Sequence, residues 1–181
     1  MVTQTFDISG QPAKRAHQHF AEGQVQRHRL DVIATSPGDV VQTTGGWLFD
    51  RVMAGWQVHV FLPGGGTAQP LRILGVQVLD LESALDPSGP MSQSLAVSAE
   101  AFTAHECVRE RVRKALDNRL TEVALWGQGW PLGVDRGLVR TQYQLSAAAR
   151  AFKGQALRAA GIPYQSIDPT ETVLTDSAWL G

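Results

Sequence analysis

The stretch TSPGDVVQTTGG, residues 35–46, separates a short apolar run from an amphipathic one. The run before it, residues 30–34, has the length and composition of a buried strand. The run after it carries an apolar stripe at helical spacing. Ser36 suits the cap of a helix, Pro37 its first position and Asp39 the acidic position of a capping box. The stretch is therefore predicted to lead from a strand into a helix, where α/β proteins often hold their chemistry.

Strands and helices alternate along the rest of the chain. Further strands are predicted at 56–62, 76–81 and 121–126, with a short extended piece at 94–98. Helical segments are predicted at 71–75, from a capping box at Thr103–Glu106 to Leu120, and at 143–160. Alternation through short connections predicts an α/β fold: a three-layer, Rossmann-like, mainly parallel sheet with helices on both faces. Candidate site loops, beyond the carboxyl ends of the strands, are 35–39, 80–90 and 126–137.

Composition excludes several function classes. The 181 residues are expected to form a polar N-terminal arm, 1–28, and a single α/β domain, 29–181. The net charge of −1 gives no overall attraction to nucleic acid or anionic membrane. The single cysteine, Cys107, cannot build an internal disulfide or a multi-cysteine zinc site. With no long apolar run and no apolar signal segment at the start, a cytoplasmic protein is expected.

The opening unit resembles that of the LmbE/PIG-L family of zinc-dependent deacetylases. That family begins with a strand, a His-Pro-Asp-Asp-type loop, a helix with a Gly-Gly pair, a Gly at the helix end and a Val-x-Val strand. The residues that match this pattern without a gap are Pro37, Asp39, Gly45, Gly46, Gly55, Val58 and Val60.

Later segments are similar to later units of the same family. LRILGVQVLDLE, residues 71–82, resembles its next helix end and strand. LTEVALWGQGWPLGVDRGLVR, residues 120–140, resembles the strand and the His-x-Asp-His loop that follow. AFKGQALRA, residues 151–159, resembles a Lys-x-x-Ala-Leu helix. The resemblance covers most of residues 29–160 and implies the family's Rossmann-like fold.

The resemblance also implies a set of site positions, and most have changed residue type. In the family the His of the first loop, the second Asp of its pair and the last His of the second loop bind zinc, while the first Asp is the general base. Here the first His position is Ser36, the base position is Gly38, and the second Asp is retained as Asp39. The two histidine positions of the second loop are Gly133 and Arg136, with Asp135 between them.

These substitutions predict that the chain binds no zinc and needs no other cofactor. A metal-bound water requires about three protein ligands, and Asp39 alone cannot supply them. Asp39 is expected either to support the helix start or to pair with Arg136, which would occupy the vacated metal position. Other residues assigned to a possible cleft are Gly45, Gly46, Asp80, Glu82, Trp126 and Trp130. The basic residues of the helix near 106–120 are interleaved with acids and predict a solvated, salt-bridged face.

Three functions remain open from the sequence. The favoured one is a non-catalytic LmbE/PIG-L-like protein with a binding or regulatory role, acting on a protein partner or on a second copy of itself. The second is a diverged hydrolase or deacetylase acting on an N-acyl sugar-like substrate in the same cleft, through Asp39, Asp80, Glu82 or Asp135. The third is an unrelated Rossmann-like binding module. No nucleic-acid or membrane partner is expected.

Overall fold

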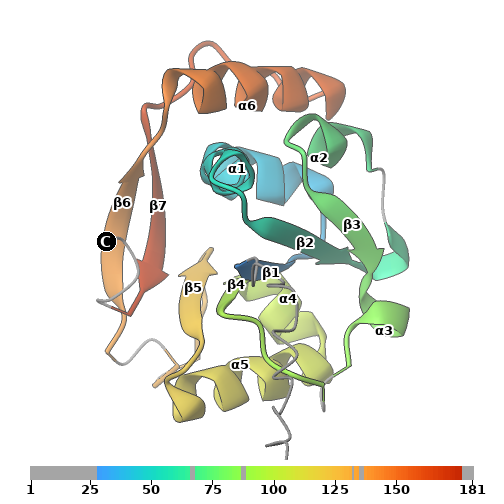
Figure 1. Ribbon diagram of the computed structural model, residues 1–181, viewed down its shortest axis with the longest axis vertical. Helices are drawn as coiled ribbons and strands as arrows, with labels where there is room; N and C mark the ends of the chain where they lie inside the picture. The colour runs from blue at the N-terminus through green and yellow to red at the C-terminus, as the bar shows by residue number, and fades with distance from the viewer. Residues whose placement is uncertain (1–27, 66–67, 87–88, 132, 135–136, 177–181) are drawn as a thin grey trace, which may run out of the picture.

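The computed structural model describes residues 28–65, 68–86, 89–131, 133–134 and 137–176. Its centre is a seven-stranded sheet with strand order β3-β2-β1-β4-β5-β7-β6 (Figure 1). The strands are β1 (Arg29–Ile33), β2 (Gln57–Leu62), β3 (Gln77–Asp80), β4 (Ser94–Ser98), β5 (Glu122–Trp126), β6 (Val139–Gln144) and β7 (Thr170–Thr175). The helices are α1 (Pro37–Met53), α2 (Gln69–Ile73), α3 (Leu81–Ala84), α4 (Ala99–Ala104), α5 (Glu106–Asn118) and α6 (Ala147–Ala159), with a short 3-10 turn at Pro63–Gly65.

The first five strands run parallel, and the last two extend the sheet in antiparallel pairing. The chain moves outward from β1 to β3 and then returns to place β4 on the other side of β1. The connections that leave β1 and β4 therefore diverge, which creates the kind of crevice where open α/β sheets bind ligands. The stretch quoted at the opening, 35–46, begins at this point.

Helices cover both faces of the sheet, so the molecule has three layers (Figure 1). Side chains alternate along β1: Leu30 and Val32 join one apolar cluster with α1, α2 and α6, whereas Ile33 joins a second cluster with α4 and α5. This alternation is the period of two that a strand buried on both faces requires. The predicted α/β fold is confirmed, and the four predicted strands lie in one sheet.

Two strands, β6 at the edge of the sheet and β7 next to it, were not predicted, and one helix was predicted too long. Residues 143 and 144 belong to β6, and α6 begins only at Ala147 behind its cap Ser146. The sequence of β6, VRTQYQ, is polar and exposed or half-buried throughout, so it carries no apolar signal for a strand. Its partner β7 lies in the tail 164–181, which the sequence analysis assigned to no element. β6 is a strand through its pairing with β7, whereas β7 pairs with both β5 and β6.

The predicted capping box at Thr103–Glu106 is wrong. Thr103 lies inside α4, where its hydroxyl donates to the carbonyl oxygen of Ala99. Ser98 caps α4 instead, because its Oγ accepts from the backbone N–H of Ala101. His105 separates α4 from α5 and caps neither helix with its side chain. The predicted helix is α5, which begins at Glu106, and the additional helix α4 precedes it.

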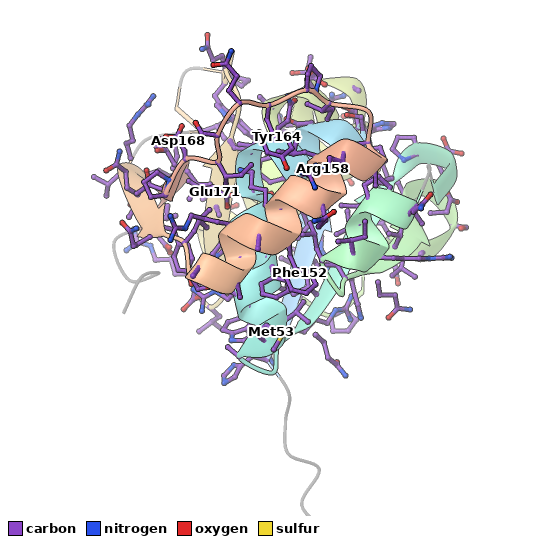
Figure 2. All side chains as sticks on the ribbon, turned by 90° about the horizontal axis from the view of Figure 1, so that it is seen from above. Met53, Phe152, Arg158, Tyr164, Asp168 and Glu171 are labelled. Carbon is purple, nitrogen blue, oxygen red and sulfur yellow. The ribbon has the colours of Figure 1, made fainter. Side chains whose placement is uncertain are left out.

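Viewed from above, α6 crosses over α1 and lies beside α2, and the apolar side chains of Met53 and Phe152 remain at the surface of the molecule (Figure 2). Met53 and Phe152 are exposed over 69% and 44% of their surface. Phe152 stacks on Phe49 with ring centroids 4.5 Å apart, which anchors α6 to α1. None of the helices in the described ranges has both the length and the apolar character needed to cross a bilayer.

Candidate functional site

The site begins at the amino end of α1, at the carboxyl edge of the sheet. Ser36 has extended backbone angles and its Oγ accepts from the backbone N–H of Asp39 at 3.2 Å. Pro37 fills the first helical position, where its missing N–H costs no hydrogen bond. The structure therefore has the predicted change from strand to helix at this stretch, and Ser36 is the N-cap of the helix.

Asp39 connects α1 to the end of β5. Its Oδ2 accepts from the indole Nε1–H of Trp126 at 2.8 Å, and its Oδ1 accepts from the hydroxyl of Thr43 at 3.2 Å. Trp126 is the last residue of β5 and is buried. The first site loop and the start of the second therefore meet at one edge of the sheet, as the parallel strand order requires.

Gly38, at the position of the general base in the resemblance, faces Ile162. A β-carbon built on Gly38 would lie 3.2 Å from Ile162 Cδ1, closer than most packed side chains approach. The apolar segment after α6 thus fills the space beside the first loop. On its other side the hydroxyl of Thr35 donates to Glu100 in α4 at 2.7 Å.

The second loop is described only in part. Gly133 has a φ of +100°, a conformation that favours glycine and strains a histidine. Asp135 and Arg136 lie outside the described residues, so the pairing of Arg136 with Asp39 stays a prediction. The described beginning of the loop turns sharply at Gly127, whose φ is +90° and where a β-carbon would lie 3.1 Å from Ala99 Cβ.

The described residues do not fit the three-ligand zinc site that the resemblance implies. Both Asp39 oxygens already accept hydrogen bonds, and the Ser36 hydroxyl is used as a helix cap. Within the described ranges, no group of three or more His, Cys, Asp or Glu side chains has the geometry of a metal site. A hydroxyl at the position of the first histidine is a poor substitute for an imidazole ligand, and the glycines at positions 38 and 133 supply no ligand or base.

Gly45 and Gly46 are buried in α1, where Gly45 faces Leu74 at the end of α2 and Gly46 faces Leu145 and Glu171. The Glu171 carboxylate of β7 accepts from the backbone N–H of Gly46 at 2.9 Å and of Trp47 at 2.8 Å. A β-carbon on Gly46 would lie 2.6 Å from a methyl group of Leu145 and 3.2 Å from Glu171 Oε1. Gly46 is therefore required for this carboxylate to reach the helix backbone.

Lys153 of α6 completes the same cluster. Its Nζ lies 2.6 Å from Glu171 Oε1 and donates to the carbonyl oxygen of Gln42 at 2.6 Å. The ion pair thus spans the backbone groups of one turn of α1, Gln42 C=O and Gly46 N–H. Burial raises the pKa of Glu171, and the charge of Lys153 only partly offsets that rise. Lys153 matches the Lys of the Lys-x-x-Ala-Leu segment, and here its contacts are with α1 and β7.

Asp80 and Glu82 lie at the end of β3, at the far side of the sheet from β5. Asp80 caps α3, and hydrogen bonds from the Ser83 hydroxyl and backbone N–H lower its pKa. Glu82 is exposed. Because β2 stands between β3 and β1, roughly 10 Å of sheet separates these acids from the Asp39 end of β1. The structure does not bring them together with Asp39.

The two tryptophans have different surroundings. Trp126 belongs to the apolar cluster beneath α1 and holds Asp39, as described above. Trp130 is half-buried in the opposite cluster, where its ring lies 5.1 Å from that of Phe102 at 57°. Its Nε1 is buried and has no hydrogen-bond partner within the described residues. Both rings cover the edge of the core.

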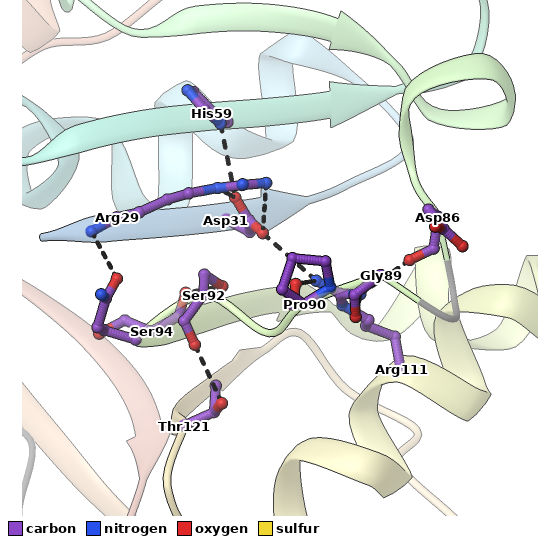
Figure 3. A network of polar contacts seen from close by, with 11 residues as sticks. Arg29, Asp31, His59, Asp86, Gly89, Pro90, Ser92, Ser94, Arg111 and Thr121 are labelled. Atoms are coloured by element: carbon purple, nitrogen blue, oxygen red, sulfur yellow. Dashed lines mark hydrogen bonds and ion pairs between the residues drawn. The ribbon is translucent and has the colours of Figure 1, made fainter.

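A buried polar network, which the sequence analysis did not identify, lies under α5 (Figure 3). Asp31 of β1 is fully buried and accepts two hydrogen bonds from the Arg29 guanidinium. Arg111 of α5 lies 3.7 Å from Asp31, and His59 Nδ1 lies 3.7 Å from its other oxygen. Burial, followed by the charge of Arg29, lowers the pKa of His59.

Arg111 corrects the predicted solvated face of α5. Only 3% of its surface is exposed, and its guanidinium donates to the carbonyl oxygens of Asp86, Gly89 and Pro90. Its contact with Asp31 and with three carbonyls satisfies the buried charge. Arg111 therefore ties the backbone of Asp86, Gly89 and Pro90 to α5 and the sheet.

Comparison with known proteins bears on the fold. No family model and no curated protein matches the sequence. Among solved structures, A40926 pseudoaglycone deacetylase Dbv21 is similar with a TM-score of 0.52 and 17% identity, over 82% of this chain and 96% of that chain. The chain shares its fold with this deacetylase. A deacetylase–teicoplanin complex from teicoplanin biosynthesis matches with a TM-score of 0.52 and 14% identity, over 82% of this chain and 98% of that one. The zinc-inhibited form of teicoplanin deacetylase Orf2 also has a TM-score of 0.52, with 13% identity over 81% and 97%.

Proposed function

We propose that this chain is an LmbE/PIG-L-like protein that forms no zinc centre and acts by binding rather than by catalysis. The observation that carries the proposal is the state of Asp39. The resemblance assigns this residue to the metal, yet its two oxygens accept from Trp126 and Thr43. Asp39 thereby joins α1 to β5 through hydrogen bonds within the protein.

Two further features support the proposal. Ser36, at the position of the first histidine, caps α1, and Gly38, at the position of the base, faces an apolar side chain. General acid–base chemistry needs a titratable group within hydrogen-bond reach of the substrate, and glycine supplies none. The role that we assign is binding or regulatory, and the partner is another protein or a second copy of this chain.

The deacetylase-like fold also accommodates the rival function, a diverged hydrolase that uses Asp39 as a base. An assay separates the two. Purified protein is incubated with N-acetylglucosamine conjugates, with and without added zinc, and released acetate is measured for wild type and Asp39→Asn. We expect no release above the uncatalysed rate in either protein. Turnover by wild type that disappears in Asp39→Asn, while the variant stays folded by circular dichroism, would overturn the non-catalytic proposal.

A further inference from the structure

A hollow of about 200 Å³ opens at the carboxyl end of β5, beside the candidate site. It is lined by Leu125, Trp126, Gly127, Gln128, Arg140, Thr172 and Leu174. These residues come from β5, β6 and β7 and from the first turn of the second loop. The hollow is smaller than the roughly 300–1,000 Å³ of drug-sized pockets, so it suits a ligand of few atoms.

The hollow exists because β5 and β7 separate. Their ladder contains two pairs, Ala124 with Thr175 and Leu125 with Leu174, and then stops. Continued in the same register, Gly127 would face Thr172, and both residues line the hollow instead. The strand edges beyond the last pair therefore offer backbone donors and acceptors to an extended, amide-bearing ligand, as an open sheet edge does.

The floor and rim of the hollow have different character. Leu125, Leu174 and Arg140 are direct partners across β5, β7 and β6, so their side chains lie on one face of the sheet. The two leucines form an apolar floor next to one cation. The Arg140 side chain is exposed and makes no ion pair or hydrogen bond with the described residues, and no acidic side chain of the described ranges lines the hollow. A guanidinium in this position matches a carboxylate at two points.

We propose that this hollow binds a carboxylate that is followed by an amide and carries a small apolar side group, the chemistry of an N-acylated amino acid. Arg140 pairs with the carboxylate, the strand edges at Gly127 and Thr172 bond the amide, and the leucine floor holds the apolar group. The proposal deepens the binding role proposed above and rests on it. The same chemistry occurs in a free N-acylated amino acid and at the C-terminus of a peptide.

The test is a titration followed by two-dimensional amide NMR. The probes are N-acetyl-leucine, its neutral carboxamide, and an acetylated tetrapeptide ending in leucine. We expect N-acetyl-leucine to bind with a Kd on the order of 1 mM and to shift the signals of Gln128, Thr172 and Leu174. The carboxamide should bind roughly tenfold more weakly or worse, because a charge-assisted contact is lost. If the tetrapeptide binds more tightly than N-acetyl-leucine, the natural ligand is the C-terminus of a protein. If the two probes bind with equal affinity, the natural ligand is a small molecule.

Arg140→Gln should weaken the binding of N-acetyl-leucine by the same factor and leave the affinity for its carboxamide unchanged. Arg150→Gln is the matched control, since Arg150 is also exposed but lies on α6. Equal binding of acid and carboxamide, unchanged affinity in Arg140→Gln, or no shifts at the lining residues at high millimolar ligand would overturn the proposal. The zinc content of the protein is measured before the titration. Failure of N-acetyl-leucine to bind would therefore count against this ligand and not against the proposal that the chain forms no zinc centre.

Discussion

Replacing Lys153 with methionine should destabilise the protein by about 3–5 kcal/mol, because it leaves the buried Glu171 carboxylate without its cation. The two side chains are 7% and 3% exposed, so water cannot replace the lost partner. Methionine keeps much of the aliphatic stem, and the packing of α6 against α1 changes little. The Gln42 carbonyl also loses its donor, while Glu171 keeps the N–H groups of Gly46 and Trp47. The loss is therefore expected within that range rather than above it.

The effect should depend on pH. Burial raises the pKa of Glu171 above its ordinary value, and removing Lys153 raises it further. A raised pKa means that the folded state binds the proton more tightly, so stability is retained at low pH and lost as pH rises through the folded-state pKa. Urea unfolding of Lys153→Met should show a larger deficit at about pH 8 than at about pH 5.

Two controls make this experiment decisive. Arg150→Met, on the exposed side of the same helix, should change the free energy of unfolding by less than about 0.5 kcal/mol. The double variant Lys153→Met with Glu171→Gln should lose less than the sum of the single variants, because no charge is left buried. A loss in Lys153→Met below about 1 kcal/mol, or one that is the same at both pH values, would refute the assignment of a buried ion pair that holds α1.

Three further changes test neighbouring features by urea unfolding. Gly46→Ala should destabilise the protein by about 1–3 kcal/mol, because the added β-carbon would overlap the methyl groups of Leu145. Gly45→Ala should be close to neutral, since the nearest atom to its β-carbon would be 3.3 Å away. Equal effects of the two variants would contradict the close approach of Leu145 to Gly46. Wild-type stability should fall as pH drops below about 6.5, because burial lowers the pKa of His59 in the folded protein. His59→Gln should flatten this part of the plot of stability against pH. An unchanged slope in the variant would exclude His59 as the cause of the fall. Arg111→Met should cost about 3–5 kcal/mol and make the backbone at Asp86, Gly89 and Pro90 more sensitive to proteolysis; protection equal to wild type would argue against its role in holding these residues.

The core of the fold could be predicted because its strands are short apolar runs. Residues 30–34, 56–62, 76–81 and 121–126 are short runs rich in apolar side chains, most of which lie in the two apolar clusters. The start of α1 was predictable as well, since Ser36 and Pro37 are local signals that act within one turn. The predicted meeting of the loops after β1 and β5 followed from the parallel order of the strands.

The antiparallel edge was not predicted. β6 is mostly polar and is a strand through its pairing with β7, while β7 takes its place between β5 and β6 only in the assembled sheet. The same holds for the buried charges. Nothing in the local sequence marks Arg111 as buried or Glu171 as the partner of Lys153, since the pairs join residues far apart in the chain. The hollow lined by Arg140 and Thr172 depends on where the β5–β7 ladder stops, which is a property of the assembled sheet.

We propose that Asp39 is a structural residue rather than a zinc ligand. The most direct test is the zinc content of the protein after exposure to excess zinc and removal of loosely bound metal, measured for wild type and Asp39→Ala. The account predicts zinc far below one equivalent per chain in both proteins, with Asp39→Ala less stable than wild type because the Trp126 indole N–H loses its acceptor. Zinc close to one equivalent in wild type that is lost in a folded Asp39→Ala would contradict it.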